Sequence, residues 1–312
     1  MNHQHQIGIK QFWVAVGISL LVLPLILYAW LHFSRPPRTN QERSLFQGIT
    51  YRREVRSTPR PMMIHIVTVD LKAPGIRVLV TPGRATSDNT DIEARTTSEF
   101  VKEFKLQLAV NASFFHPFRE KTPWDYFPKS GDRVNILGQA ISNGSSYSKA
   151  QIKWPMLCFF ASKAGGRVPI SDRAQIQSSE QCPSGTVQAV AGNEILIMQG
   201  KPIGLSLHPP DNAAYPRVAV ALNQEGEKLW LIVIDGKQPL YSEGATMAEL
   251  TKIVKELGAY TALNLDGGGS TTLVATTPEG LTLLNAPIHT KLPMRQRPVA
   301  NHIGFYALPI RN

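Results

Sequence analysis

Cysteine is scarce in this sequence, since only Cys158 and Cys182 occur among 312 residues. No second cysteine or histidine stands near either one, which excludes the usual spacing of a zinc site. An even pair in an exported domain is compatible with one disulfide, whose loop closure would stabilise the fold by about 3 kcal/mol. Two buried free thiols are the alternative. We expect the disulfide, with its Cα atoms about 4.4 to 6.8 Å apart.

Charged residues are absent between Phe12 and Phe33. This run matches the roughly 20 residues that a helix needs to cross a hydrocarbon core. It is longer than the apolar region of a cleaved signal peptide, which has about 7 to 15 residues. A cleavage site is also missing, because the bulky Leu27 stands two places before Ala29. We therefore expect an uncleaved transmembrane helix at residues 12–33 after a short tail at residues 1–11, with a signal peptide as the alternative.

Acidic residues are fewer than basic ones, 23 against 33, so the formal net charge is +10. Arginines crowd residues 34–60, where only Glu42 and Glu54 oppose them. This stretch is expected to be a solvated basic linker that can rest on anionic headgroups. Because no basic helix, zinc module or aromatic stacking module accompanies the charge, we do not expect a nucleic-acid partner.

The basic residues also bear on orientation. Lys10 precedes the apolar segment, whereas Arg35, Arg38 and Arg43 follow it, so the positive-inside rule alone would leave the large domain in the cytoplasm. Long domains are translocated largely regardless of flanking charge. The cysteine pair favours export, and we expect residues 34 onward to lie outside the cytoplasm.

Short alternating or apolar runs dominate the rest of the chain and predict strands at residues 62–71, 76–81, 106–110, 217–222, 229–234 and 259–265. Helices are predicted at residues 97–105 and 247–257, each opened by a Thr-x-x-Glu capping box. With 43% hydrophobic residues the chain can bury a sizeable core. The expected fold is α+β, or mixed α/β: a single β-rich domain at residues 61–310 with a mixed sheet and a few helices.

One stretch, residues 260–274, combines an apolar run, Asp266, three glycines and a hydroxyl cluster. Glycine lets a backbone turn sharply or lets a ligand approach bare N–H groups. A hairpin is one interpretation, but it needs only one or two glycines. The surplus favours a backbone nest for an anionic or sugar ligand, formed by Gly267, Gly268 and Gly269. A P-loop is excluded, because no Gly-Lys-Ser/Thr follows.

Two Asp-Gly pairs, Asp235-Gly236 and Asp266-Gly267, end predicted strands on either side of one predicted helix. If that helix is a right-handed crossover, the strands are parallel and both acids face one crevice. Cleaving a glycosidic bond generally requires two carboxyl groups. Asp266 is the first candidate, and Asp235 and Glu243 compete for the second role. Ordinary turns are the alternative. No cofactor is expected, although such a pair of acids can also hold Ca²⁺ or Mg²⁺.

Regular periodicity is missing between His116 and Ser148, where Pro, Gly, aromatic and polar residues predominate. Such a stretch is typical of a long functional loop over a site. Its aromatic side chains can stack on sugar rings or anchor a small core of their own, and they are Trp124, Tyr126, Phe127 and Tyr147.

Four sequence blocks resemble those of the phosphodiester glycosidase family, in the same order over roughly residues 60 to 308. They are Val110-Asn-Ala-Ser-Phe-Phe115, Tyr215-Pro-Arg-Val-Ala-Val220, Leu263-Asn-Leu-Asp-Gly-Gly-Gly-Ser270 and Arg297-Pro-Val-Ala-Asn301. The first block departs from the family pattern, because Ala112 and Ser113 stand where the family usually has glycines.

The resemblance implies roles for further residues. Arg217 and Arg297 would neutralise a phosphate leaving group, since a guanidinium meets phosphate oxygens bidentately. Asn111 and Asn264 would hold sugar hydroxyls or orient the acids. Ser270, Thr271 and the glycine N–H groups would receive the phosphate.

Residues and resemblance together predict a membrane-anchored, extracytoplasmic hydrolase that cleaves a sugar 1-phosphodiester in a surface or wall glycan. The alternative is a non-catalytic binding module for exopolysaccharide or cell-wall glycans, which would keep the glycines and arginines without turnover.

Overall fold

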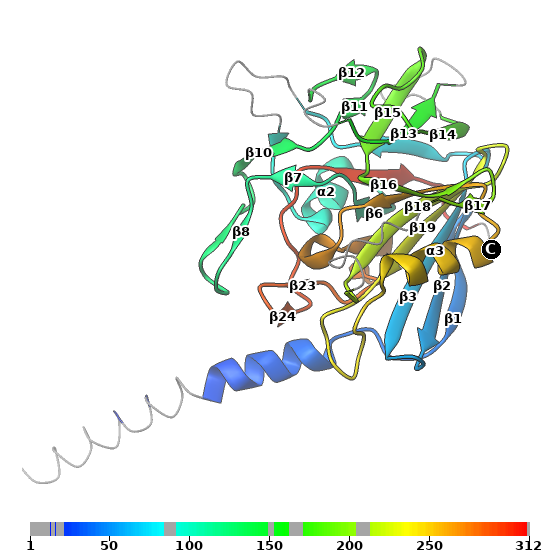
Figure 1. Ribbon diagram of the computed structural model, residues 1–312. Helices are drawn as coiled ribbons and strands as arrows, with labels where there is room; N and C mark the ends of the chain where they lie inside the picture. The colour runs from blue at the N-terminus through cyan, green and yellow to red at the C-terminus, as the bar shows by residue number, and fades with distance from the viewer. Residues whose placement is uncertain are drawn as a thin grey trace, which may run out of the picture.

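The computed structural model describes residues 13, 16, 22–83, 92–148, 153–161, 171–203 and 213–310. A helix covers residues 22–33 and extends away from the β-rich body (Figure 1). Among the described residues, no helix is both long enough and apolar enough to cross a membrane. The tail at residues 1–11 and much of the stretch 12–21 lie outside the described residues. The transmembrane helix at residues 12–33 therefore stays a prediction.

The largest sheet has eight strands in the order β1-β2-β3-β19-β18-β20-β16-β17. Their bounds are β1 Gln41–Phe46, β2 Ile49–Arg56, β3 Met62–Asp70, β16 Glu194–Met198, β17 Lys201–Pro202, β18 Arg217–Leu222, β19 Lys228–Ile234 and β20 Thr261–Leu265. The central strands are apolar on both faces, as expected for strands that are covered on both sides.

The prediction of a mixed sheet is wrong, because every pair of neighbouring strands in this sheet is antiparallel. β19 and β20 do run in the same direction, as predicted from the strand-helix-strand order. However, β18 lies between them and pairs antiparallel with both. The turn at residues 223–226 folds β18 and β19 into a hairpin, so β20 reaches the sheet on the far side of β18.

A second sheet of five strands faces the first, in the order β22-β21-β6-β25-β4. The strands are β4 Arg77–Val80, β6 Leu108–Asn111, β21 Leu273–Thr277, β22 Gly280–Leu283 and β25 His302–Tyr306. Buried residues of both sheets, such as Val110 and Val220, form one apolar cluster. The core of the molecule is therefore the space between two antiparallel sheets.

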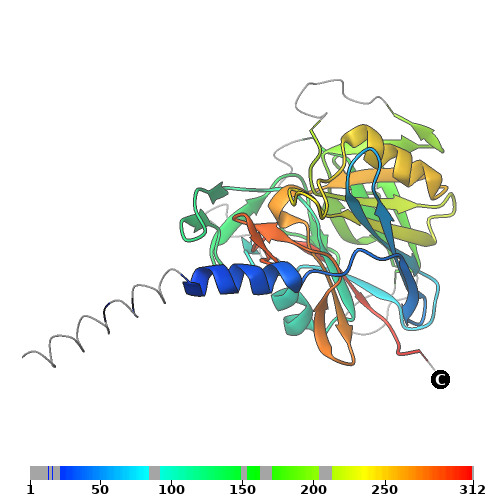
Figure 2. The same ribbon diagram turned by 90° about the horizontal axis from the view of Figure 1, so that it is seen from below.

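Two helices cover the outer faces of this pair of sheets. α3, Met247–Glu256, buries Leu250 and Ile253 against the eight-stranded sheet. α2, Thr97–Phe104, buries Phe100 and Val101 against the five-stranded sheet. Figure 2 shows them on opposite sides. Both begin with the predicted capping box, in which Thr96 or Thr246 pairs with the glutamate three residues later.

Smaller sheets complete the body. One has the order β12-β11-β15-β13-β14, with β11 Ile141–Ser142, β12 Ser145–Ser146, β13 Met156–Phe160, β14 Arg173–Gln177 and β15 Thr186–Ala191. Another has the order β5-β10-β7, with β5 Ile92–Glu93, β7 Phe115–His116 and β10 Arg133–Ile136. Two pairs stand alone, β8 Arg119–Glu120 with β9 Tyr126–Phe127 and β23 Ile288–His289 with β24 Leu292–Pro293.

Residues 34–60, expected to form a basic linker, are instead part of the domain. β1 and β2 lie within this range, and β2 pairs with β3 along its whole length. Ile49 and Tyr51 of β2 are buried in the main core at 0% and 1% exposure. Arg53 continues the buried face of Ile49 and Tyr51 at 7% exposure, so a basic residue stands where the alternation of a strand calls for an apolar one, which is why charge alone misled the prediction.

The predicted disulfide is confirmed. Cys158 of β13 is joined to Cys182, and their Cα atoms are 5.8 Å apart. The bridge fastens the segment after β14 to the five-stranded sheet that contains β13.

We expect Cys182→Ser to lower the free energy of unfolding by about 3 kcal/mol, because the variant regains the chain entropy that the bridge removes from the unfolded state. In a protein of this size that loss lowers the melting temperature by roughly 6–12 °C. Thermal unfolding with and without reductant measures the effect. Reductant should destabilise the wild type and leave Cys182→Ser unchanged, and equal melting temperatures under oxidising conditions would contradict the expectation.

Candidate active site

A cleft of about 410 Å³ opens where β18 begins and β20 ends. Predicted residues in its lining are Arg217, Asn264, Asp266, Gly267, Gly268, Gly269 and Arg297. The lining also contains Phe114, Phe115, Phe118, Glu120, Leu137, Asn193, Tyr215, Pro216, Lys237 and Leu265. Arg217 belongs to the second of the resembling blocks and Asp266 to the third. The antiparallel pairing of Val218 with Leu265 explains why these two residues meet at one edge of the sheet.

Gly268 and Gly269 form a short 3-10 turn with Ser270, capped by Gly267, rather than the tip of a hairpin. β20 before the turn and β21 after it belong to different sheets, so the hairpin interpretation is wrong. A different structural constraint favours glycine at each of the three positions. A Cβ on Gly267 would lie 2.5 Å from the Pro216 carbonyl oxygen, and one on Gly269 would lie 2.5 Å from an Arg297 nitrogen. Gly268 has a φ of +60°.

Two of the three glycine N–H groups of the predicted nest already have partners within the protein. The Gly268 N–H donates to the Pro216 carbonyl at 2.8 Å. The Gly267 N–H donates to the Asp266 carboxylate. These two amides are used within the protein, and the glycines mainly permit Pro216 and Arg297 to approach the turn closely.

Asp266 is partly buried at the foot of this turn. Burial raises the pKa of Asp266 to about 6, although the hydrogen bond from Ser270, the charge of Arg297 and the Gly267 N–H all lower it. A carboxyl group with such a pKa exchanges protons readily near neutral pH, which is the property required of an acid or base catalyst.

Arg297 connects the turn to the opposite wall of the cleft. Its Nη1 donates to Ser270 Oγ at 3.2 Å and its Nε donates to His289 Nδ1 at 3.3 Å. Its Nη2 forms an ion pair with Glu120. The side chain is therefore fixed on three sides, with one face turned to the cleft that it lines.

Glu120 of β8 is a cleft residue that sequence reasoning missed. Its Oε1 accepts the Thr290 N–H at 2.8 Å, and its Oε2 lies 3.7 Å from His289 Nδ1. The contact with His289 and the charge of Arg297 lower the pKa of Glu120 to about 2, while partial burial opposes the shift. Burial also lowers the pKa of His289, which favours the neutral imidazole. The positive charge beside Glu120 therefore comes from Arg297. The only signal in the sequence was that Glu120 lies in the predicted loop at residues 116–148.

Two further cations line the cleft. Arg217 Nε donates to the Ala245 carbonyl at 3.0 Å, which orients its guanidinium. Lys237, which the sequence did not single out, has its Nζ 4.8 Å from the centre of the Tyr215 ring. Burial lowers the pKa of Lys237, the charge of Glu120 raises it, and the charge of Arg297 lowers it further. The cleft is therefore electropositive around Asp266.

The two predicted asparagines lie in different places. Asn264 lines the cleft, and its Nδ2 donates to Asn193 Oδ1 at 2.7 Å. Asn111 is fully buried behind the turn, where its Nδ2 donates to the Asp266 carbonyl at 2.6 Å and its Oδ1 accepts the Thr272 N–H at 3.0 Å. Asn111 thus fixes the backbone of the catalytic candidate instead of contacting a ligand.

Ser270 and Thr271 do not line the cleft, contrary to the expectation that they receive a phosphate. Both are buried, at 0% and 2% exposure, and the Ser270 hydroxyl is occupied by Arg297 and Asp266. The predicted stacking residues Trp124, Tyr126, Phe127 and Tyr147 are not in the lining either. The aromatic side chains of the cleft are those of Phe114, Phe115, Phe118 and Tyr215.

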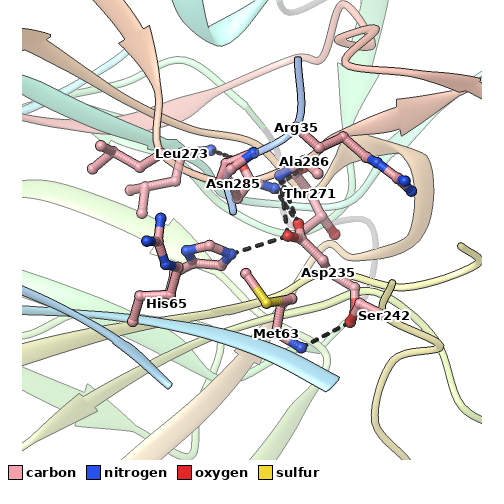
Figure 3. Close-up of polar contacts among 12 residues, drawn as sticks. Arg35, Met63, His65, Asp235, Ser242, Thr271, Leu273, Asn285 and Ala286 are labelled. Carbon is pink, nitrogen blue, oxygen red and sulfur yellow. Dashed lines mark hydrogen bonds and ion pairs between the residues drawn. The ribbon is translucent and has the colours of Figure 1, made fainter. Parts of the chain in front are cut away.

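Asp235 does not meet Asp266 in the cleft. It is 1% exposed and lies among polar partners in the interior (Figure 3). Its Oδ1 accepts from Asn285 Nδ2 at 2.9 Å and from the Ala286 N–H at 2.9 Å, and its Oδ2 is 3.0 Å from His65 Nε2. The parallel direction of β19 and β20 was predicted correctly, but with β18 between them the two acids point to different partners.

The Asp235 cluster supports the glycine turn from behind. Asn285 also donates to the Thr271 carbonyl at 3.1 Å and accepts the Leu273 N–H at 2.7 Å, so it holds the chain immediately after the turn. Asp235 orients this asparagine, and its place in the fold is structural.

Glu243 is also outside the cleft lining. Its backbone bonds to Pro61 and Lys237, in the loop that leads to α3. Within the described ranges, no group of three or more His, Cys, Asp or Glu side chains is arranged to hold a metal ion.

The family model for phosphodiester glycosidases matches residues 104–306. Among solved structures, the catalytic domain of zebrafish N-acetylglucosamine-1-phosphodiester alpha-N-acetylglucosaminidase, auto-inhibited by its pro-peptide, is 18% identical with a TM-score of 0.55, covering 90% of this chain and 93% of that chain. A hypothetical protein from Synechocystis is 17% identical with a TM-score of 0.53, covering 88% of this chain. This chain spans 64% of the Synechocystis protein. At these identities the likeness establishes the fold alone. Curated proteins yield no match.

We expect Asp235→Asn to lower the free energy of unfolding by about 2 kcal/mol, because the amide keeps only one of the two oxygens that face Asn285, Ala286 and His65 and leaves a buried group unpaired. The folded fraction should keep most of its activity, since Asp235 does not reach the cleft. Denaturant unfolding and activity per folded molecule measure the two effects, with Glu243→Gln as a control that changes neither. A stable but inactive Asp235→Asn protein would restore the catalytic interpretation of this residue.

Proposed function

Because the chain belongs to the phosphodiester glycosidase family, we propose that it is a hydrolase that cleaves the bond between a sugar and a phosphodiester in a surface or wall glycan. The observation that carries the proposal is Asp266, a carboxyl group whose pKa is raised to about 6 in a cleft lined by three cations.

Asp266 is the proton-transfer group in this proposal. Ionised Asp266 takes a proton from a water molecule while the water oxygen attacks the anomeric carbon. The bond between that carbon and the phosphate oxygen breaks, and its electron pair leaves with the phosphate. The products are a reducing sugar and a phosphomonoester. A phosphate is already a good leaving group, so charge neutralisation matters more here than protonation of the leaving oxygen.

The cations of the cleft supply that neutralisation. Arg297 is held against the glycine turn and beside Asp266, so it is the first candidate to meet the phosphate oxygens. Arg217 and Lys237 lie on the neighbouring wall. Glu120, with its pKa of about 2, stays ionised and keeps Arg297 in place. Its role in this proposal is to position Arg297.

The sugar would occupy the less charged part of the cleft. Phe114, Phe115 and Phe118 offer apolar faces to a pyranose ring, and Asn193 and Asn264 offer amide groups to its hydroxyls. These residues do not distinguish one sugar from another.

We further propose that the protein acts outside the cytoplasm and is anchored through residues 12–33. The disulfide between Cys158 and Cys182 supports this location, because such bridges persist in oxidising compartments. The apolar helix at residues 22–33, which continues the uncharged stretch of the sequence, supports the anchor.

We expect Asp266→Asn to lower kcat by at least about 100-fold, since a positioned acid or base commonly contributes that much. The melting temperature should stay the same or rise. Folding raises the pKa of Asp266, so its ionisation above pH 6 opposes folding, and a neutral amide removes that cost. Release of reducing sugar from sugar 1-phosphodiesters, together with thermal unfolding, measures both.

Asp70→Asn serves as a control, because Asp70 ends β3 and is exposed, away from the cleft. A fully active Asp266→Asn variant would remove Asp266 from the mechanism. If neither the wild type nor the variant turns over any sugar phosphodiester but both bind glycan saturably, the hydrolase proposal fails in favour of a binding module.

The pH dependence of kcat/KM should show an acid limb near pH 6. Ionised Asp266 is the active form, so activity falls about tenfold per unit as the pH drops below its pKa of about 6. Because the pKa of Lys237 is lowered by burial, a second fall is expected on the alkaline side below the ordinary lysine value of 10.5. Lys237→Arg should remove the alkaline fall only. An acid limb centred near the ordinary aspartate value of 3.8 would contradict this assignment.

A further inference from the structure

The segment between the N-terminal helix and β1, residues 34–40, is fastened to the domain, and we refer to it as the strap. The guanidinium of Arg35 lies 4.2 Å from the centre of the Tyr241 ring, and its Nη1 donates to Gln238 Oε1 at 3.3 Å. The Tyr241 hydroxyl donates to the Pro36 carbonyl at 2.8 Å. The first half of the strap is therefore bound to one turn of the domain.

The second half of the strap is bound as well. Arg38 Nη1 donates to the Leu240 carbonyl at 2.7 Å. Arg53 of β2 donates to the carbonyl and the hydroxyl of Thr39 at 2.8 and 3.0 Å, and the Val55 N–H donates to Asn40 Oδ1 at 2.8 Å. No free length of chain thus separates the helix at residues 22–33 from the body of the protein, as Figures 1 and 2 also show.

The turn that receives the strap, residues 237–241, belongs to the rim of the cleft, and we call it the rim turn. It begins with Lys237, which lines the cleft. Leu240 follows in a left-handed conformation with a φ of 66°, which directs its side chain outward. At 87% exposure Leu240 is the most exposed large hydrophobic side chain in the described part of the chain.

The helix beside this turn presents apolar side chains all round. Leu25 is 69% exposed, Trp30 64% and Phe33 84%. A helix that is apolar on every side belongs in an apolar environment. Arg35 and Arg38 follow it directly, and their guanidinium groups bond neutral partners on the rim turn, so their positive charges remain available to anionic headgroups.

We propose that the rim turn, with Leu240 at its tip, is a membrane-contact surface that holds the mouth of the cleft at the headgroup layer. The inference rests on the proposed anchoring through residues 12–33 and adds the face by which the domain meets the bilayer. Leu240 enters the boundary between headgroups and acyl chains, and Arg35 and Arg38 meet lipid phosphates. The substrate class follows from this placement: a sugar phosphodiester whose other end is held in the membrane.

The experiment uses the full chain reconstituted into vesicles of phosphatidylcholine and phosphatidylglycerol. Leu240→Cys carries an environment-sensitive fluorophore, and the native cysteines do not react because they are joined to each other. Ile203→Cys is the matched control, since Ile203 is 43% exposed and follows β17 at the opposite edge of the eight-stranded sheet from β1. Brominated acyl chains quench fluorophores that reach the hydrocarbon boundary.

We expect a blue-shifted emission and at least about a twofold loss of intensity for the label at position 240, with the label at position 203 unaffected, as for an aliphatic side chain at the membrane interface. Equal quenching at both positions in protein that floats with the vesicles would overturn the rim-turn surface and leave the anchor intact. Protein that does not float with the vesicles would overturn both. Sugar phosphodiester hydrolysis, measured on the same samples with a soluble substrate, reports on the enzymatic proposal separately.

Discussion

The close approach of the Gly267–Gly269 turn to Pro216 on one side and to Arg297 on the other determines the geometry of the whole cleft. Side chains at Gly267 or Gly269 would collide with these neighbours at 2.5 Å. The approach sets Asp266 beside Arg297 and places both at the start of β18, where Arg217 lies. Asn111 and Asn285 then hold the chain on either side of the turn. Asp266 is thus positioned by backbone contacts and buried amides, whereas Arg297 is held by the side chains of Ser270, His289 and Glu120.

The pKa values of the two carboxyl groups of the cleft are shifted in opposite directions. Asp266 forms no direct ion pair with any residue that the structure describes, so burial dominates and raises its pKa to about 6. Glu120 has Arg297 and His289 against it, so attraction dominates and its pKa falls to about 2. Environments that give two acids very different pKa values are typical of catalytic sites, where one group must exchange a proton and the other must stay charged. Arg297 acts on both groups, because it lies beside Asp266 and forms an ion pair with Glu120.

The N-terminal part of the domain links this cleft to the proposed anchor. β2 contributes Ile49 and Tyr51 to the main core, and the strap before β1 is bonded to the rim turn that carries Lys237. The strap is therefore part of the folded domain and not a flexible linker between the cleft and the helix at residues 22–33.

The sequence by itself determined the local features of this protein. Capping boxes at Thr96 and Thr246, the strands on either side of Asp266 and the pairing of two cysteines all depend on near neighbours or on a single possible partner. The blocks around Asn111, Arg217, Asp266 and Arg297 were sufficient to indicate the family. Only the tertiary structure decided which acids meet. Asp235 follows a strand as Asp266 does, yet β18 separates the two strands, and Asp235 contacts His65 of β3 on the other side of β19. Glu120 and Lys237 enter the cleft from a loop and a turn that have no periodic pattern. The position of Glu120 depends on its bond with Arg297, 177 residues away, and Lys237 lies over the ring of Tyr215, contacts that no local pattern reveals.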